Sequence, residues 1–101
     1  MKKHNRKMLN FIGRRFTGSI VTIKNHRKRS ILISEAINER FNVNVYQYQL
    51  KHYKWLLAEN NKHLNSSTQY NYWLTVKKLI ALTQKTTHWE PLLQGAWVRP
   101  K

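Results

Sequence analysis

Positive charge is the chemistry that this sequence offers most clearly. Its 101 residues include nineteen Lys and Arg against four acidic residues, all of them Glu, for a formal net charge of +15. Ammonium and guanidinium groups neutralise phosphates and release condensed counterions, which gives affinity for nucleic acids that does not depend on base sequence. A protein that is merely basic and soluble is the alternative, but so strong a field attracts polyanions. The composition therefore favours a nucleic acid as partner.

The basic residues are densest near the amino terminus. Ten of the first 29 residues are Lys or Arg, and none is acidic. Glycines at positions 13 and 18 interrupt any periodicity, so we interpret residues 1–18 as a flexible basic arm that reaches additional phosphates. An ordinary disordered terminus has the same composition. The candidate phosphate contacts in this arm and the segment after it are Arg14, Arg15, Lys24, Arg27, Lys28 and Arg29.

Patterns that support catalysis or metal binding are not found in the sequence. Glu35 and Glu39 are one helical turn apart, but Arg40 adjoins them, and this arrangement suits a solvated face better than a catalytic pair. The five histidines lack H-x-x-x-H and H-E-x-x-H spacing, and no Cys or Asp completes a metal site. The three glycines are too far apart for a phosphate loop. We therefore expect no catalytic residue, no metal and no cofactor, and we expect that this chain is not an enzyme.

The composition also bears on the compartment. The absence of cysteine excludes disulfides and is compatible with a reducing cytosol. The basic amino terminus is not followed by the apolar segment of a signal peptide. No apolar run approaches the ~20 residues that cross a bilayer. We expect a cytoplasmic protein without a membrane partner.

Helical periodicity predicts the elements that position these charges. At 100° per residue, one stripe of residues 19–41 carries Ile23, Ser30, Ile33, Ile37 and Phe41. Ser19 is the expected cap, and the small Ser30 and Ser34 would let another helix approach closely. A second helix is predicted over about residues 47–60, with Tyr46, Leu50, Tyr53 and Leu57 on one face and Lys51 and Lys54 beside it.

The third predicted helix begins with a capping box. Ser66 precedes Gln69 by three residues, so the hydroxyl and the amide would cap each other's backbone. Tyr72, Trp73 and Val76 fall on the core side of this helix. Asn71, Lys78 and Lys85 lie together on another side, within roughly 40° of arc. They are therefore candidates to face a partner.

These elements predict an all-α fold, a small bundle of three to four helices over residues 19–88. The basic arm (1–18) precedes it, and a tail or interdomain linker (89–101) with Pro91 and Gly95 follows it. Trp89 and Trp97 are expected to cover an end of the bundle. The alternation in "NVNVYQYQL" (42–50) leaves a short strand as an alternative. Trp55 lies off its helical face and would contact a partner or another helix.

The stretch "LNSSTQYNYWLTVKKLIAL" (64–82) resembles the signature of the SAM-like core-binding domain of phage-type tyrosine recombinases (integrases). Leu64 and Thr68 match the leading Leu and the Thr of that signature. Trp73 and Val76 fall where two Leu would lie, and Lys77 stands where the family often has Arg. The likeness spans about residues 16–86. The departures are the Trp in place of Leu and the lack of a tyrosine-nucleophile domain, so we expect a separated or truncated DNA-clamping domain.

The resemblance implies a non-catalytic helical clamp on duplex DNA, which further copies of the recombinase would share. It also implies phosphate or base contacts from all three helices. By position these contacts are Lys24, Arg27, Lys28 and Arg29 on the first helix, Lys51 and Lys54 on the second, and Thr68, Asn71, Lys77 and Lys78 on the third. Lys85 joins them through its place on the third helix. Two alternatives remain at this stage. One is a small RNA- or ribosome-associated protein, and the other is a phage or plasmid regulatory module that binds an acidic protein.

Overall fold

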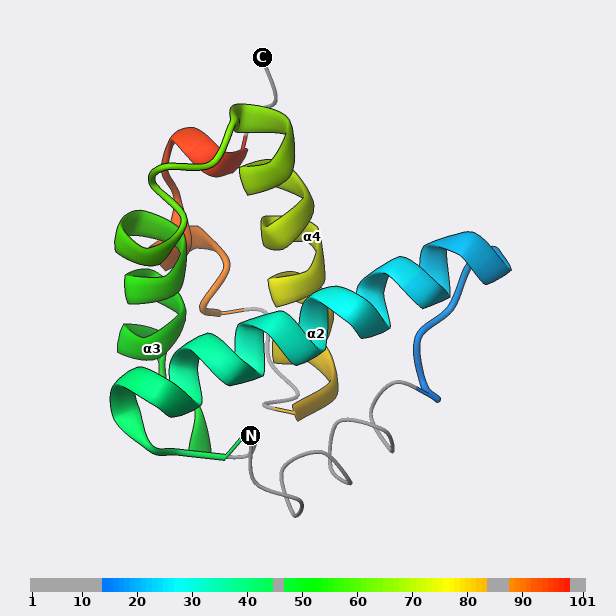
Figure 1. Cartoon of the computed structure of the whole chain (residues 1–101), viewed down its shortest axis with the longest axis horizontal. Coiled ribbons are helices and arrows are strands. Elements are labelled where there is room, and N and C mark those ends of the chain that lie inside the picture. Colours follow the sequence, from blue (N-terminus) through cyan, green and yellow to red (C-terminus); the bar gives the residue numbers. More distant parts are fainter. Residues whose placement is uncertain (1–13, 45–46, 84–87, 99–101) are drawn as a thin grey trace.

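In the part of the chain that the structure describes, three α-helices and a returning carboxy-terminal segment make up an all-α fold (Figure 1). The computed structural model describes residues 14–44, 47–83 and 88–98. The elements are α2 (Ile20–Phe41), α3 (Leu50–Trp55), the π-helical turn η2 (Leu56–Asn60), α4 (Ser66–Thr83) and the 3-10 turns η3 (Pro91–Leu93) and η4 (Ala96–Val98). The described residues contain no strand, so the alternation over 42–50 forms none outside Val45 and Tyr46, which are not described.

The ends of α2 follow the sequence prediction. Ser19 is the N-cap, and its hydroxyl accepts a hydrogen bond from the backbone N–H of Thr22 at 3.1 Å. At the other end Asn42 adopts the left-handed conformation (φ 55°) and donates its N–H to the Asn38 carbonyl. Asparagine tolerates this conformation better than most residues and often ends helices in this way. The 22-residue helix predicted from periodicity is therefore confirmed.

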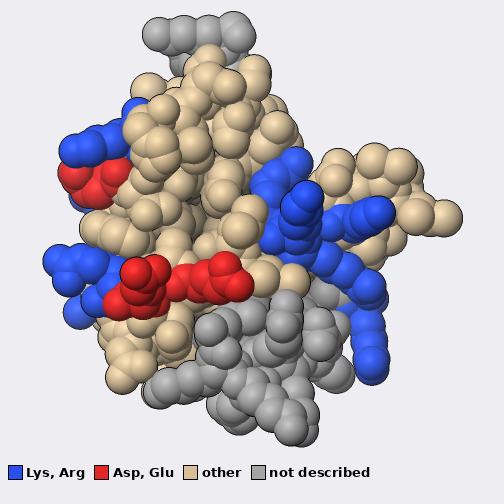
Figure 2. All heavy atoms as spheres, in the orientation of Figure 1, with Lys and Arg blue, Asp and Glu red and all other residues tan. Residues whose placement is uncertain are grey.

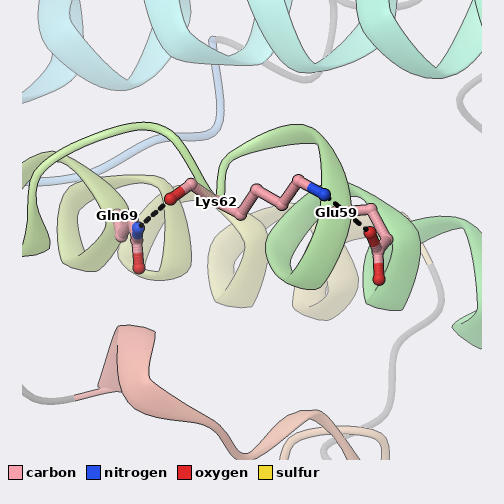
Figure 3. Close-up of polar contacts among 3 residues, drawn as sticks. All are labelled: Glu59, Lys62 and Gln69. Carbon is pink, nitrogen blue, oxygen red and sulfur yellow. Dashed lines mark hydrogen bonds and ion pairs between the residues drawn. The ribbon is translucent and has the colours of Figure 1, made fainter.

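The start of α4 differs from the predicted capping box by one residue. Asn65, not Ser66, caps this helix, because its Oδ1 accepts the Thr68 N–H at 2.8 Å. Asparagine caps as well as serine does, so sequence spacing alone could not choose between them. The Gln69 side chain instead donates to the Leu64 carbonyl at 2.7 Å and to the Lys62 carbonyl at 3.5 Å. Lys62 in turn pairs with Glu59 at 3.6 Å (Figure 3), so Gln69 ties α4 to the end of η2.

The core lies where α2 crosses α4 and where α3 and η2 run beside α4 (Figure 1). The close approach of neighbouring segments to α2 depends on its small residues Ser30 and Ser34, which are both buried. Ser34 accepts a hydrogen bond from the buried Tyr48 hydroxyl at 2.9 Å, so its polar group is satisfied. Each apolar side chain buried here contributes about 1.5–3 kcal/mol relative to solvent exposure. The fully or almost fully buried apolar residues are Phe16, Ile33, Ile37, Tyr48, Tyr53, Leu56, Leu57, Trp73, Val76, Leu79, Ile80 and Leu93.

The tryptophans pack within the fold. Trp55 meets Phe41 of α2 edge to face, with ring centroids 5.3 Å apart, so another helix contacts it. Trp89 packs against Tyr53, and the Trp97 indole N–H donates to the Leu93 carbonyl at 2.7 Å. These contacts fold residues 88–98 back along α3 and α4 (Figure 1). Within the part of the chain that the structure describes, no helix has the length and apolar character of a membrane span.

Candidate nucleic-acid interface

Charge divides α2 into two halves. Lys24, Arg27, Lys28 and Arg29 lie in its amino-terminal half, whereas the other half carries Glu35, Glu39 and Arg40. Lys and Arg side chains gather over the amino-terminal half of α2, and acidic side chains lie over the other half (Figure 2). The first turn contains no acidic residue, although acids there would favour the helix dipole. Helix stability therefore does not account for this charge arrangement.

A buried polar contact joins this basic half of α2 to α4. His26 of α2 is only 5% exposed, and its Nδ1 lies 2.8 Å from the Oγ1 of Thr75 on α4. Arg29 also reaches across, donating from Nη1 to the same oxygen at 3.3 Å. A buried polar side chain costs free energy unless it is hydrogen-bonded, so these bonds fix the position at which the two helices cross. The crossing brings basic residues of both helices into one region.

Lys78 lies between two hollows beside this crossing. A hollow of about 150 Å³ is lined by Arg15, Phe16, Thr17 and Lys78, with further contacts from α4. A second, of about 310 Å³, is lined by His26, Lys77, Lys78 and Glu90, among others. Of the basic residues, Arg15, Lys77 and Lys78 line these hollows. We use the name basic corner for these three together with the basic residues of the adjoining first half of α2, which are Lys24, Arg27, Lys28 and Arg29.

The two lysines of α4 have different surroundings. The Lys77 ammonium lies over the Trp73 ring, 5.6 Å from its centroid, and helps to cover this buried aromatic. Lys78 is half-buried and its charge acts on His26. Two successive residues point about 100° apart on a helix, so they serve different contacts. Lys78 and Ala81 line both hollows, and Lys78 is the cation that the two hollows share.

Other predicted contacts lie elsewhere. Lys51 and Lys54 are exposed on α3, which lies on the opposite side of the view from the first half of α2 (Figure 1). Thr68 is ten residues before Lys78, or about 15 Å along the helix, and its N–H takes part in the cap. Asn71 is half-buried on α4 and its carbonyl accepts from the Thr75 hydroxyl. Arg14 is exposed next to Arg15, and Lys85 lies outside the described residues.

Sequence reasoning missed two residues of the crossing, His26 and Thr75. Both were detectable from the helical wheel. At 100° per residue His26 falls on the stripe of Ser30 and Ile33, and so faces the partner helix. Thr75 lies on the same side of α4 as Asn71. Arg29, which we predicted as a phosphate contact, is instead half-buried and hydrogen-bonded to Thr75.

Burial lowers the pKa of both buried histidines. For His26 the positive charges of Arg29 and Lys78 lower the pKa further, and for His52 the charge of Lys51 does so. The Nδ1 of His52 accepts the Gln49 backbone N–H at 2.8 Å at the start of α3. A backbone N–H can only donate, so this bond requires an unprotonated Nδ1. The neutral imidazole is therefore part of the cap of α3.

We expect the fold to lose stability in weak acid. The unfolded histidines take up protons near their ordinary pKa of 6.5, whereas the folded ones do so only at lower pH. The free energy of unfolding is therefore full above pH 6.5 and falls as pH drops below it. Each kcal/mol lost lowers Tm by about 4–8 °C in a domain of this size. Thermal unfolding between pH 7.5 and 5 measures the effect.

Replacement of single histidines separates the contributions. His52→Gln should reduce the dependence of Tm on pH to the part that His26 contributes, because the imidazole that must stay unprotonated in the cap of α3 is gone. The exposed His63 provides the matched control, and His63→Gln should keep the dependence of the unchanged protein. An unfolding free energy that stays constant from pH 7.5 to 5 in the unchanged protein would contradict the assignment.

The chemistry available at the basic corner is ionic recognition. Within residues 14–44, 47–83 and 88–98, no group of three or more metal-ligating side chains could hold an ion. Among the described residues, no carboxylate forms a salt bridge with Lys24, Lys28 or Lys78. Comparisons with protein-family models, with curated proteins and with solved structures gave no match.

Proposed function

We propose that this chain binds duplex DNA through the basic corner and catalyses no reaction itself. One observation carries the proposal: the crossing of α2 and α4 gathers basic side chains from three segments of the chain. They come from the residues before α2, from the first half of α2 and from the middle of α4. Such convergence favours a polyanion whose charges are closely and regularly spaced, as phosphates are along DNA.

The lysines of the basic corner form no salt bridge with a described carboxylate, which supports a phosphate ligand. Lys24 and Lys28 are exposed, and among the described residues no carboxylate pairs with them or with Lys78. Their counterions come from solvent, so binding to DNA breaks no internal ion pair. Release of the ions condensed on DNA then drives association.

The aromatic residues favour a duplex over unpaired bases. Proteins that hold single strands stack bases on accessible aromatic rings. Here the exposed large apolar side chains among the described residues are Ile20, Val21, Leu32 and Leu92, and none is aromatic. Trp73 of α4 is buried beneath Lys77. Contacts to the sugar–phosphate backbone therefore suit this surface better than base stacking.

The resemblance of residues 64–82 to the core-binding domain of tyrosine recombinases points to the same ligand. In that family the domain clamps duplex DNA while another domain performs the chemistry. The corresponding proposal is that this chain is such a non-catalytic clamp. Lys77, which stands where the family often has Arg, and Lys78 both belong to the basic corner, together with Arg15 and the first half of α2.

Titration with a 20-base-pair duplex at several salt concentrations tests the proposed function. Each phosphate contact adds about −0.9 to the slope of log K against log salt, so five contacts give a slope of about −4.5. Absence of binding at ~50 mM salt would refute the proposal. Competition by structured RNA at matched salt provides the second readout. A clear preference for RNA would make the RNA- or ribosome-associated reading the better one.

A further inference from the structure

The smaller hollow of the basic corner has the features of a site for one phosphate. Its volume of about 150 Å³ leaves room for a group of the size of phosphate. A phosphate group has five heavy atoms. Two cations face the hollow from different segments, Arg15 before α2 and Lys78 on α4, and Thr17 adds a hydroxyl. Its apolar lining comes from Phe16, Ala81 and Leu82.

The segment that carries Arg15 is anchored in place. Phe16 is 5% exposed, and its ring packs against His26 with centroids 5.6 Å apart. Gly18 then turns the chain into α2 with φ +117°, a conformation that other residues rarely adopt. Because His26 is also bonded to Thr75 of α4, the loop and α4 are held against each other. Arg15 is thereby placed opposite Lys78 by packed neighbours.

We infer that Arg15 and Lys78 hold a single backbone phosphate of the bound DNA between them, with the adjoining deoxyribose on the apolar lining of the hollow. The inference rests on the proposed function. It places Arg15 and Lys78 on the same phosphate, whereas the proposed function alone would also allow each of them to contact a separate phosphate. An arginine presents several N–H donors in a planar fork, whereas lysine acts as a point charge. The two together satisfy more than one oxygen of the same phosphate.

The salt dependence of binding counts phosphates, so it can test whether the two residues share one. Arg15→Gln and Lys78→Gln are made singly and together, and each is titrated with the same 20-base-pair duplex from 50 to 300 mM salt. If both contact one phosphate, the double variant loses about 0.9 from the slope, whereas two separate contacts would cost about 1.8. A loss near 1.8, or an unchanged slope, would overturn the shared pocket while leaving the proposed function in place.

A variant without a charge change gives an independent test. Ala81→Leu places a larger side chain at the hollow, and the expected result is again a slope lower by about 0.9 at unchanged net charge. The control is Ala96→Leu on η4, an equally small, exposed position away from the hollow, which should bind like the unchanged protein. An Ala81→Leu protein that is folded by circular dichroism and binds normally refutes the pocket. If that variant does not fold, the Arg15 and Lys78 series decides. Lack of any salt-dependent binding by the unchanged protein refutes the proposed function itself.

Discussion

Replacing Lys24, Arg27 and Lys28 together with glutamine is expected to weaken duplex binding about a thousandfold at ~50 mM salt. All three side chains are exposed on the first half of α2. If each neutralises one phosphate, the slope of log K against log salt falls by about 2.7, and the loss shrinks to about 25-fold at ~200 mM salt. The dependence of the loss on salt separates lost phosphate contacts from a fold defect, which would not vary in this way. Fluorescence anisotropy with a labelled duplex measures both quantities.

The matched control removes the same charge from another part of the molecule. Lys51, Lys54 and Lys62 are also exposed, but they belong to α3 and to the residues after η2. Their replacement with glutamine should change affinity only through the lower net charge, with nearly the slope of the unchanged protein. Equal losses in the two triple variants would mean that binding follows net charge alone, and the basic corner would then have no special role.

Replacing Gly95 with alanine is expected to destabilise the fold by about 2 kcal/mol. A Cβ at this position would overlap the ring of Trp97. The indole could escape only by rotating away, and it would then lose its hydrogen bond to the Leu93 carbonyl and its packing. Tm should fall by about 8–16 °C, which thermal unfolding followed by circular dichroism will show.

The expected loss of stability in Gly95→Ala is opposite in sign to the usual effect of a glycine-to-alanine change. Where no contact intervenes, a change from glycine to alanine commonly stabilises a protein by about 0.4–1 kcal/mol, because it restricts the unfolded chain. The same substitution in a Trp97→Ala background should therefore be neutral or stabilising. If Gly95→Ala destabilises equally in both backgrounds, the clash with the indole is not the cause.

Periodicity was sufficient for the positions of the helices but not for their exact ends. The stripe of α2 could be predicted because one helical face repeats along the whole helix, and the cap could be predicted because Ser19, a residue type that favours this position, directly precedes it. The start of α4 could not be predicted to the residue, because Asn65 and Ser66 are adjacent and have similar capping strength. The choice between them depends on the carbonyls that Gln69 reaches at the end of η2, and these are tertiary contacts.

The candidate site was less predictable, because it is formed between helices. The basic residues could be named from the sequence, but not which of them meet. Contact between Arg29 and Thr75 joins residues 46 positions apart, and the hollow between Arg15 and Lys78 depends on how α2 crosses α4. Local patterns do not specify such a crossing. Tryptophan placement shows the same limit, since Trp55 lies off its own apolar face and is covered by Phe41.

The division of charge along α2 also has a kinetic consequence. This helix is about 33 Å long, with cations near one end and carboxylates toward the other. A polyanion is attracted more strongly to the first end than to the second, where Glu35 and Glu39 outnumber Arg40. The protein is therefore turned before contact so that its basic end meets the polyanion first. Electrostatic steering raises association rate constants by about 10- to 1,000-fold and weakens with ionic strength. Reversing Glu35 and Glu39 to lysine would thus increase attraction but remove this preference for one orientation.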